Sequence, residues 1–181
     1  MTTHRNVVGI DLSLTSTGLA IWDGESVRTS VIKSKTDAGT VESFLDRTAG
    51  IASAIENEAD LHASDLIVIE GLSMHSKSSS LDKIFGNWWL CLSQLAPQVD
   101  SPVVIVTPSQ RAMYATGKGN ASKDTVLLAV ARRYPDVPIK DNNEADALVL
   151  AAMGARWLGD PLEGSLPGDH VAAMNKVRWP K

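Results

Sequence analysis

The sequence has very little cysteine. Cys91 is the one cysteine in 181 residues, so an internal disulfide is excluded. It lies in the apolar segment "NWWLCLSQL", which predicts a buried, unreactive thiol rather than a nucleophile. No cluster of cysteine and histidine has the spacing of a zinc site, and the four histidines are scattered along the chain.

The sequence also lacks long hydrophobic runs. Its longest apolar runs are much shorter than a membrane span. The segment "MTTHRN" at the start lacks the apolar core of a signal peptide. We therefore expect a cytoplasmic protein with no membrane partner, and a length of 181 residues suits one sizeable domain.

Neither sign of charge is in large excess. The formal net charge is −4, which neither indicates nor excludes nucleic-acid binding, because binding needs a local basic patch rather than a basic total. Carboxylates clustered around a metal ion would themselves make the total more negative.

The pattern of apolar residues predicts an alternation of strands and helices. Extended segments are expected at 6–11, 17–23, 26–33, 66–70 and 102–106, and the "DGE" turn at 23–25 indicates a hairpin. Helices are expected at 41–61, 81–95, 122–134 and 143–158, and a further helix is expected to begin after Thr107 as its N-cap. The segment 71–80 is expected to form a polar loop. Three antiparallel strands followed by β–α crossovers predict an α/β fold with a mixed sheet and helices on both faces.

Two of the expected strands end in an acidic residue. The run that starts at Val7 leads to Asp11, and the run that starts at Leu66 leads to Glu70. If these strands are parallel neighbours, both carboxylates emerge at the same edge of the sheet, where ligand sites of open α/β sheets gather. Two close anions repel one another unless a cation neutralises them, and oxygen ligands favour Mg²⁺ or Mn²⁺.

The segment "DNNEADAL" supplies further oxygen ligands. Asn143 and Asp146 are three residues apart and share one helix face, and Leu150 continues that face, so Asp146 is expected to point toward the sheet. Glu144 is expected to face solvent or the outer shell of the ion. Taken singly, each of these acids also suits an ordinary turn or helix-start role, and it is their coincidence that favours a metal site.

Four segments together resemble a known family. "GIDLSLTSTGLAIW", "LIVIEGLSM", "VTPSQRAMYATGKGNASKDTV" and "NNEADALVLA" resemble, in order and spacing, the RuvC-like crossover junction endodeoxyribonucleases, which resolve Holliday junctions. The resemblance spans roughly residues 6–157. It implies a ribonuclease H-like fold with a five-stranded mixed sheet, here a nuclease domain at 1–158 followed by a loosely packed tail at 159–181.

The resemblance also implies a metal-binding set. Asp11, Glu70 and Asp146 match three of the four metal-binding acids of the family, and the fourth position falls on Asn143, where the family has an acid or a histidine. We favour Asn143 as the fourth ligand and keep Glu144 as its substitute, with Asp141 as a further source of charge. Two Mg²⁺ ions per site are implied, with Mn²⁺ able to replace them, and they would hydrolyse a phosphodiester from positions roughly 3.5–4 Å apart.

DNA contacts follow from the same resemblance. Lys118 and Lys123 match a stretch that contacts the phosphate backbone, and Ser13 follows the first acid. Ser73 stands where the family carries a stacking aromatic, so Leu72, Met74 or His75 is expected to wedge between bases instead, and flaps or forks become possible substrates beside four-way junctions. The full set of expected DNA-binding residues is Ser13, Leu72, Met74, His75, Lys77, Arg111, Lys118 and Lys123.

The expected helix at 81–95 carries two adjacent tryptophans. Trp88 and Trp89 cannot both face one core, because neighbouring positions on a helix point in different directions. We expect one of them to pack against a second copy of the chain, giving a homodimer that could cut two strands symmetrically.

Three other interpretations stay open on the sequence. The "GID" start is shared with ATPases and sugar kinases of the actin-like group, although 181 residues supply only one such domain. A non-catalytic nucleic-acid module with a decayed site is a second alternative, because Asn143 brings no charge. A ribonuclease H-like nuclease that acts on RNA or hybrids is the third.

Overall fold

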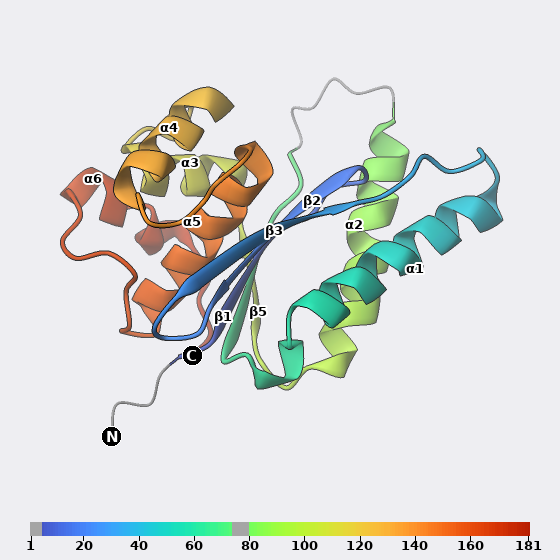
Figure 1. Cartoon of the computed structure of the whole chain (residues 1–181), viewed down its shortest axis with the longest axis horizontal. Helices are drawn as coiled ribbons and strands as arrows, with labels where there is room; N and C mark the ends of the chain where they lie inside the picture. The colour runs from blue at the N-terminus through green and yellow to red at the C-terminus, as the bar shows by residue number, and fades with distance from the viewer. Residues whose placement is uncertain (1–4, 74–79) are drawn as a thin grey trace.

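A five-stranded mixed sheet forms the centre of the molecule. We describe residues 5–73 and 80–181 of a computed structural model (Figure 1). The strands are β1 (Val7–Asp11), β2 (Ser16–Trp22), β3 (Val27–Lys33), β4 (Leu66–Glu70) and β5 (Val103–Val106). Their order in the sheet is β3-β2-β1-β4-β5. The first three strands are antiparallel, whereas β4 runs parallel to both β1 and β5, which confirms the expected fold class.

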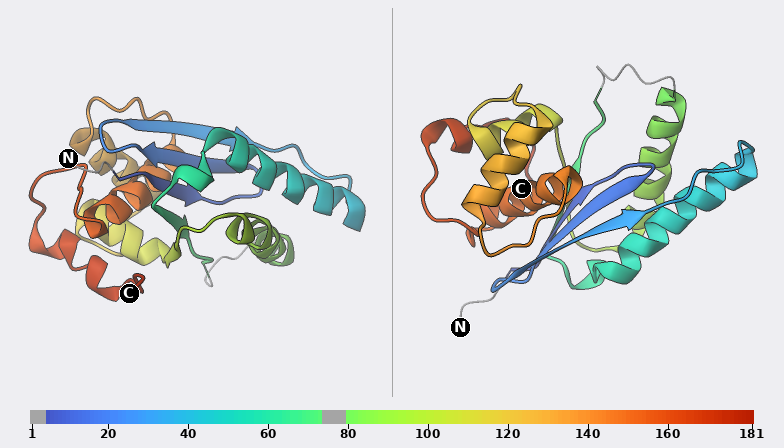
Figure 2. Two further views of the ribbon diagram at one scale, coloured as in Figure 1. Left: turned by 90° about the horizontal axis from the view of Figure 1, so that it is seen from below. Right: turned by 45° about the horizontal axis from the view of Figure 1, so that its top comes forward.

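Helices cover both faces of this sheet. α1 (Val41–Glu58) and α2 (Leu81–Leu95) lie on one face, and α3 (Pro108–Thr116), α4 (Lys123–Arg133) and α5 (Asn142–Trp157) lie on the other (Figures 1 and 2). The short helix α6 (Gly168–Val171) lies beside α3. Three 3₁₀ turns, Leu61–Ala63, Ala96–Gln98 and Met174–Lys176, complete the described elements.

The two layers have separate hydrophobic cores because side chains alternate along a strand. In β1, Val7 belongs to the core beneath α5, whereas Val8 and Ile10 belong to the core beneath α1 and α2. All three side chains are at most 1% exposed. β1 is therefore buried on both faces, as its continuous apolar sequence predicts.

Capping residues in the sequence correctly predicted where several helices begin. Thr107 caps α3, accepting a hydrogen bond from the backbone of Gln110, whose side chain in turn accepts from the Thr107 amide at 2.8 Å. Pro108 fills the first helical position, where its missing N–H costs nothing. The helix expected at 41–61 ends earlier, at Glu58, and is followed by the 3₁₀ turn at Leu61–Ala63.

α5 packs unusually close to the sheet, and two glycines allow it. A Cβ atom on Gly9 would lie 2.2 Å from the carbonyl oxygen of Ala147, and one on Gly18 would lie 2.0 Å from the carbonyl oxygen of Asn143. Neither distance is possible for a real side chain. The backbone of α5 therefore rests directly on β1 and β2, and this fixes the position of its first turn.

The C-terminal segment packs against the domain, so the expectation of a loosely packed tail is wrong for its described contacts. Ala173 is fully buried, and Val177 is 8% exposed. The Trp179 ring stacks on the Trp157 ring, with the ring centroids 5.5 Å apart and the planes 10° apart. Contacts of this kind depend on surfaces assembled from distant segments, and the Pro, Gly and basic residues of the tail did not reveal them.

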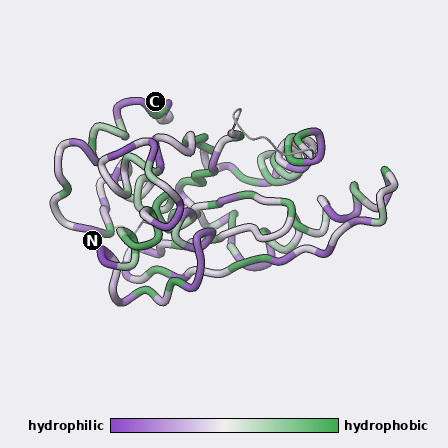
Figure 3. The backbone as a smooth tube through the Cα atoms, turned by 90° about the horizontal axis from the view of Figure 1, so that it is seen from above, coloured by the Kyte–Doolittle hydropathy of each residue, from purple (hydrophilic) through white to green (hydrophobic). Residues whose placement is uncertain are grey.

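None of the helices within residues 5–73 and 80–181 has the length and apolar character needed to cross a membrane. Hydrophobic and hydrophilic segments are interleaved along the backbone (Figure 3).

The close approach of α5 gives a test of the fold. Gly9→Ala should lower the free energy of unfolding by about 1–3 kcal/mol or more, because the added methyl group must push α5 away from β1. Denaturant unfolding measures this change. Gly50→Ala is the matched control, since a Cβ there meets nothing within 4 Å and should stabilise α1 by up to about 1 kcal/mol. Equal effects of the two substitutions would contradict the close packing.

Candidate metal centre and nuclease site

Two acidic side chains lie at the carboxyl end of the central strands. β1 and β4 are parallel neighbours, with Ile10 opposite Ile69 in register. Asp11 and Glu70 each follow directly as the last residue of its strand. Both residues are half-buried. The two carboxylates therefore emerge side by side, as the sequence predicts.

The N-terminal part of α5 brings a third acid to the same place. Gly18 is the partner of Asp11 across the β1–β2 ladder, and the backbone of Asn143 lies directly over Gly18. One turn further on, Asp146 is 1% exposed, which confirms that its side chain points inward.

Asn143 is held in a defined position. Its backbone amide donates to the Asp141 carboxylate at 2.9 Å, and its side-chain Nδ2 donates to Ser16 Oγ at 3.1 Å. Because Nδ2 is the donor in this contact, the amide oxygen is the atom of Asn143 that can coordinate a cation. Asn143 lines the same cleft as Asp11.

Arg111 connects two of the acids. Its Nε donates to Glu70 Oε2 and its Nη1 donates to Asp146 Oδ1. Arg111 is 5% exposed. The sequence suggested a DNA contact for this residue, but its guanidinium is turned inward and is occupied by the two acids. A buried ion pair of this kind neutralises part of the negative charge at the sheet edge.

Burial raises the pKa values of the three acids. Burial, followed by repulsion from Glu70, raises the pKa of Asp11 to about 7. Burial is also the main reason why the pKa of Asp146 rises to about 6, even though Arg111 opposes the shift. The pKa of Glu70 is raised for the same reason. Burial is the largest cause of each shift, so the raised pKa values mean that the charged forms of these acids are costly without a bound cation.

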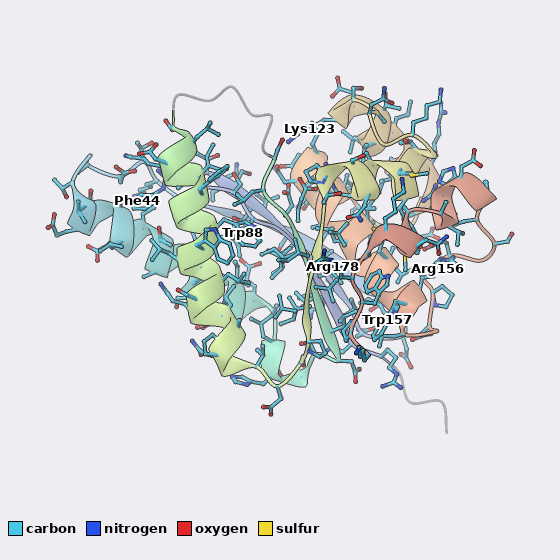
Figure 4. The ribbon with its side chains drawn as sticks, turned by 180° about the vertical axis from the view of Figure 1, so that it is seen from behind. Phe44, Trp88, Lys123, Arg156, Trp157 and Arg178 are labelled. Carbon is cyan, nitrogen blue, oxygen red and sulfur yellow. The ribbon has the colours of Figure 1, made fainter. Side chains whose placement is uncertain are left out.

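Lys123 is the second cation that acts on the cluster. It is the first residue of α4, and its positive charge lowers the pKa of Asp11, Glu70 and Asp146. Lys123 lies at the end of the molecule where the chain leaves β4 (Figure 4).

The donor set suits a hard divalent cation. It offers carboxylate and amide oxygens only, which are the ligands that Mg²⁺ and Mn²⁺ prefer. Asp146 Oδ2 is buried and has no hydrogen-bond partner in the structure, so one oxygen is left for a cation. Within residues 5–73 and 80–181, however, no three acidic, histidine or cysteine side chains already converge as a metal-binding group. The Arg111 guanidinium lies between two of the candidate ligands.

The Glu144 side chain is buried rather than exposed to solvent. It is 1% exposed, so the expectation that it faces solvent is wrong. Its carboxylate accepts a hydrogen bond from the backbone amide of Lys140, because the first turn of α5 is covered by the segment that precedes it. Asp141 lies nearer the cluster, since its charge raises the pKa of Asp11.

A cleft of about 520 Å³ opens beside the acids. Asp11, Ser13, Asn143 and Lys123 contribute to its lining. The backbone amide of Ser13 donates a hydrogen bond to Thr17 Oγ1 at 3.1 Å, and the Thr17 hydroxyl donates to the Ser13 carbonyl oxygen at 2.9 Å. These two bonds hold the turn between β1 and β2 at the wall of the cleft.

A charged cluster that the sequence did not single out anchors the far side of this cleft. Asp37 pairs with Lys83 at 2.8 Å and with Arg47 at 3.2 Å, and the contact with Lys83 is the main reason why the pKa of Asp37 falls to about 2. Arg47 also donates to Ser34 Oγ at 3.0 Å and to the Leu14 carbonyl oxygen. It thereby ties the β1–β2 turn to α1.

Trp88 is another supporting residue that the sequence analysis did not assign to the site. Its indole Nε1 donates to the Glu70 carbonyl oxygen at 2.8 Å, and the ring is on the side of α2 that faces the sheet (Figure 4). The apolar period of α2 predicts that one tryptophan is buried, but a contact with the backbone of Glu70 requires the tertiary structure.

The other expected DNA-binding residues are placed as follows. Lys118 is exposed in the loop between α3 and α4. Leu72 is half-buried and packs against the core beneath α1 and α2, a contact that it would have to leave in order to wedge between bases. Met74, His75 and Lys77 lie outside the described residues.

Sequence comparison identifies relatives over almost the whole chain. No protein-family model matches it. The chain is 30% identical over 176 residues to a crossover junction endodeoxyribonuclease RuvC from Paenarthrobacter aurescens, covering 96% of this chain and 92% of the relative. This chain belongs to the RuvC family. A RuvC from Rhodococcus jostii is 29% identical, again with 96% and 92% of the two chains covered.

Solved structures agree with the RuvC assignment at the level of the fold. Thermus thermophilus RuvC in complex with a Holliday junction superposes with a TM-score of 0.59 at 18% identity, covering 87% of this chain and 98% of that one. The yeast mitochondrial Holliday junction resolvase gives a TM-score of 0.57 at 13% identity, covering 87% and 80%. The expected ribonuclease H-like architecture is confirmed.

The raised pKa values predict how stability changes with pH in chelator. The folded pKa of Asp11 is about 7 and that of Asp146 is about 6, against an ordinary value of 3.8. Between roughly pH 4 and pH 7 the folded state therefore binds more protons than the unfolded state, and the free energy of unfolding falls as pH rises. We expect a decrease of about 1–3 kcal/mol between pH 5 and pH 8, measured by denaturant unfolding in EDTA.

Asp11→Asn is the control for this pH dependence. The substitution removes the most strongly shifted carboxyl, so the decrease should be markedly smaller in the variant. A pH profile identical to that of the unmodified chain would show that Asp11 is not responsible.

Proposed function

We propose that this chain is a metal-dependent endodeoxyribonuclease that cleaves branched DNA such as the Holliday junction. The observation that carries the proposal is the gathering of Asp11, Glu70 and Asp146 at one edge of the sheet in a member of the RuvC family. Flaps and forks are further candidate substrates. The place of action is the cytoplasm.

Four residues would hold the metal in this proposal. Asp11, Glu70, Asp146 and Asn143 would hold two Mg²⁺ ions, with Mn²⁺ as a substitute. When bound, the ions would supply activation of a water molecule and stabilisation of the leaving 3′ oxygen. Glu144 is the weaker alternative to Asn143, because its carboxylate already accepts a hydrogen bond from Lys140.

The basic residues around the cleft would position the DNA backbone. Lys123 lines the cleft beside Asp11, where an ammonium group can meet the phosphate that is to be cut. Exposed Lys118 extends this basic surface along the loop before α4. Ser13 offers a hydroxyl at the cleft wall. These contacts fix the register of the DNA without reading its sequence.

Cleavage of a synthetic four-way junction in Mg²⁺ tests the proposal. Asp11→Asn should abolish nicking while junction binding, measured by gel shift, changes less than about threefold, because the carboxylate holds metal rather than DNA. Asp136→Asn is the matched control, since Asp136 is exposed and lies outside the lining of the cleft. Undiminished nicking by Asp11→Asn would contradict the proposed role of the acids.

The same assay separates the competing functions. Four-way, three-way, flap, linear duplex and RNA–DNA hybrid substrates are compared in Mg²⁺, Mn²⁺ and EDTA. Metal-independent binding without nicking of any substrate would identify a nucleic-acid-binding module with a decayed site. Preferential cleavage of the hybrid would identify a nuclease of the ribonuclease H type.

A homodimer is the proposed active form. Trp88 is 4% exposed, whereas Trp89 on the same helix is 60% exposed, and a large aromatic surface of this kind favours burial against a partner. A two-fold enzyme could place one site on each of two strands.

Light scattering of the eluting protein tests the dimer. The unmodified chain should have twice the mass of one chain, and Trp89→Ala should shift the population toward the monomer. Leu128→Ala is the control, because Leu128 is 51% exposed on α4, on the opposite face of the sheet. A monomeric unmodified chain at assay concentration would overturn the proposed dimer.

A further inference from the structure

Arg111 is a buried arginine that contacts two acids of the candidate metal site. It is the fourth residue of α3, and the cap formed by Thr107 and Pro108 fixes where that helix begins, directly after β5. From there its side chain reaches the end of β4 at Glu70 and the first turns of α5 at Asp146. One guanidinium thus joins the three elements that carry or support the acids.

The contacts of Arg111 use the oxygens that a metal ion would need. Glu70 Oε2 and Asp146 Oδ1 each accept one of its N–H groups, and its side chain is 6% exposed. An arginine cannot lose its proton in a protein. A divalent ion that bound these same two oxygens would therefore have to lie against a permanent positive charge, which electrostatic repulsion disfavours.

The second carboxylate oxygen of Asp146, Oδ2, is not bonded to Arg111. Asp146 Oδ2 is buried and makes no hydrogen bond, so a cation can use it while the guanidinium stays in place. The ligands of the cluster therefore fall into two groups. Asp146 Oδ2 is available beside Asp11 and Asn143, whereas Glu70 Oε2 and Asp146 Oδ1 are held by Arg111.

We propose that Arg111 is a built-in counter-cation that competes with divalent metal for Glu70 and Asp146, so that full loading of the site exchanges the guanidinium for an ion. The inference rests on the metal-dependent function proposed above. It gives Arg111 a positioning role: the guanidinium holds the acids together before metal binds, and it weakens the affinity for the ion that takes its place. A first ion enters without this exchange.

Isothermal titration of the metal-free chain with Mn²⁺ measures the competition. The unmodified chain should show one tighter and one weaker binding step. Arg111→Met, which keeps an unbranched apolar stem but removes the charge, should bind the second ion at least tenfold more tightly. Arg111→Lys should stay close to the unmodified chain, because its ammonium group remains a cation between the acids. A second step that is unchanged or weaker in a folded Arg111→Met protein overturns the proposal.

Thermal unfolding distinguishes competition from a merely structural ion pair. In EDTA, Arg111→Met should melt at a lower temperature than the unmodified chain, because the acids lose their counter-charge. Saturating Mn²⁺ should raise its melting temperature by more than it raises that of the unmodified chain. An equal loss of stability with and without Mn²⁺ would indicate a structural role alone and contradict the competition.

A measurement on the unmodified chain does not depend on the variant folding. The Nε–H group of Arg111 should give a protected NMR signal, assigned by its absence in Arg111→Lys. Addition of Mg²⁺ should move this signal to the position of solvent-exposed arginines. An unmoved signal at saturating Mg²⁺ overturns the exchange while leaving the nuclease function intact. If neither ion binds the unmodified chain, the metal-dependent function and this inference both fail.

Discussion

The burial of three mutually repelling carboxylates at one edge of the sheet is the constraint on which the site depends. Asp11, Glu70 and Asp146 come from segments far apart in the sequence, and burial makes their charges costly. Among the described residues, Arg111 opposes this cost by direct contact and Lys123 by proximity. Even with these cations present, burial keeps the pKa values of all three acids raised. A divalent cation bound to the carboxylate oxygens would reduce this cost further.

The close contact between α5 and the sheet determines where the cluster forms. Gly9 and Gly18 remove the side chains that would separate the helix backbone from β1 and β2. Because Gly18 is the ladder partner of Asp11, the start of α5 is fixed beside the first acid rather than merely near the sheet. The opposite layer contributes support: Trp88 holds the backbone of Glu70, and Arg47 holds the β1–β2 turn. The site is thus built at the boundary between two independently packed layers.

Asn143 brings an uncharged amide to the cluster, at a position where the resemblance to the family implies an acid or a histidine. The amide keeps an oxygen ligand but lowers the negative charge by one compared with an acid. Asp141, which caps α5, partly restores the negative field at Asp11. Arg111, which is paired with Glu70 and Asp146, instead makes the local field more positive and lowers the pKa of both acids. The electrostatics of this site therefore differ from a simple four-acid arrangement, although the chain is 30% identical to a RuvC over nearly its whole length.

Local patterns were enough to predict the strands, the helix starts and the three acids. Continuous apolar runs that end in Asp11 and Glu70, the helical period that turns Asp146 inward and the Thr107 cap all depend on neighbours within a few residues, so they can be read along the chain. The inward turn of Arg111, the burial of Glu144 against Lys140 and the packing of the tail through Trp157 and Trp179 could not be predicted in this way. From the sequence alone, a basic side chain is expected to lie on the surface. Whether it contacts solvent or an acid depends on elements that come together from distant positions in the chain. Long-range packing decides which charges face one another, and it is the folded chain that sets the balance of charge at the site.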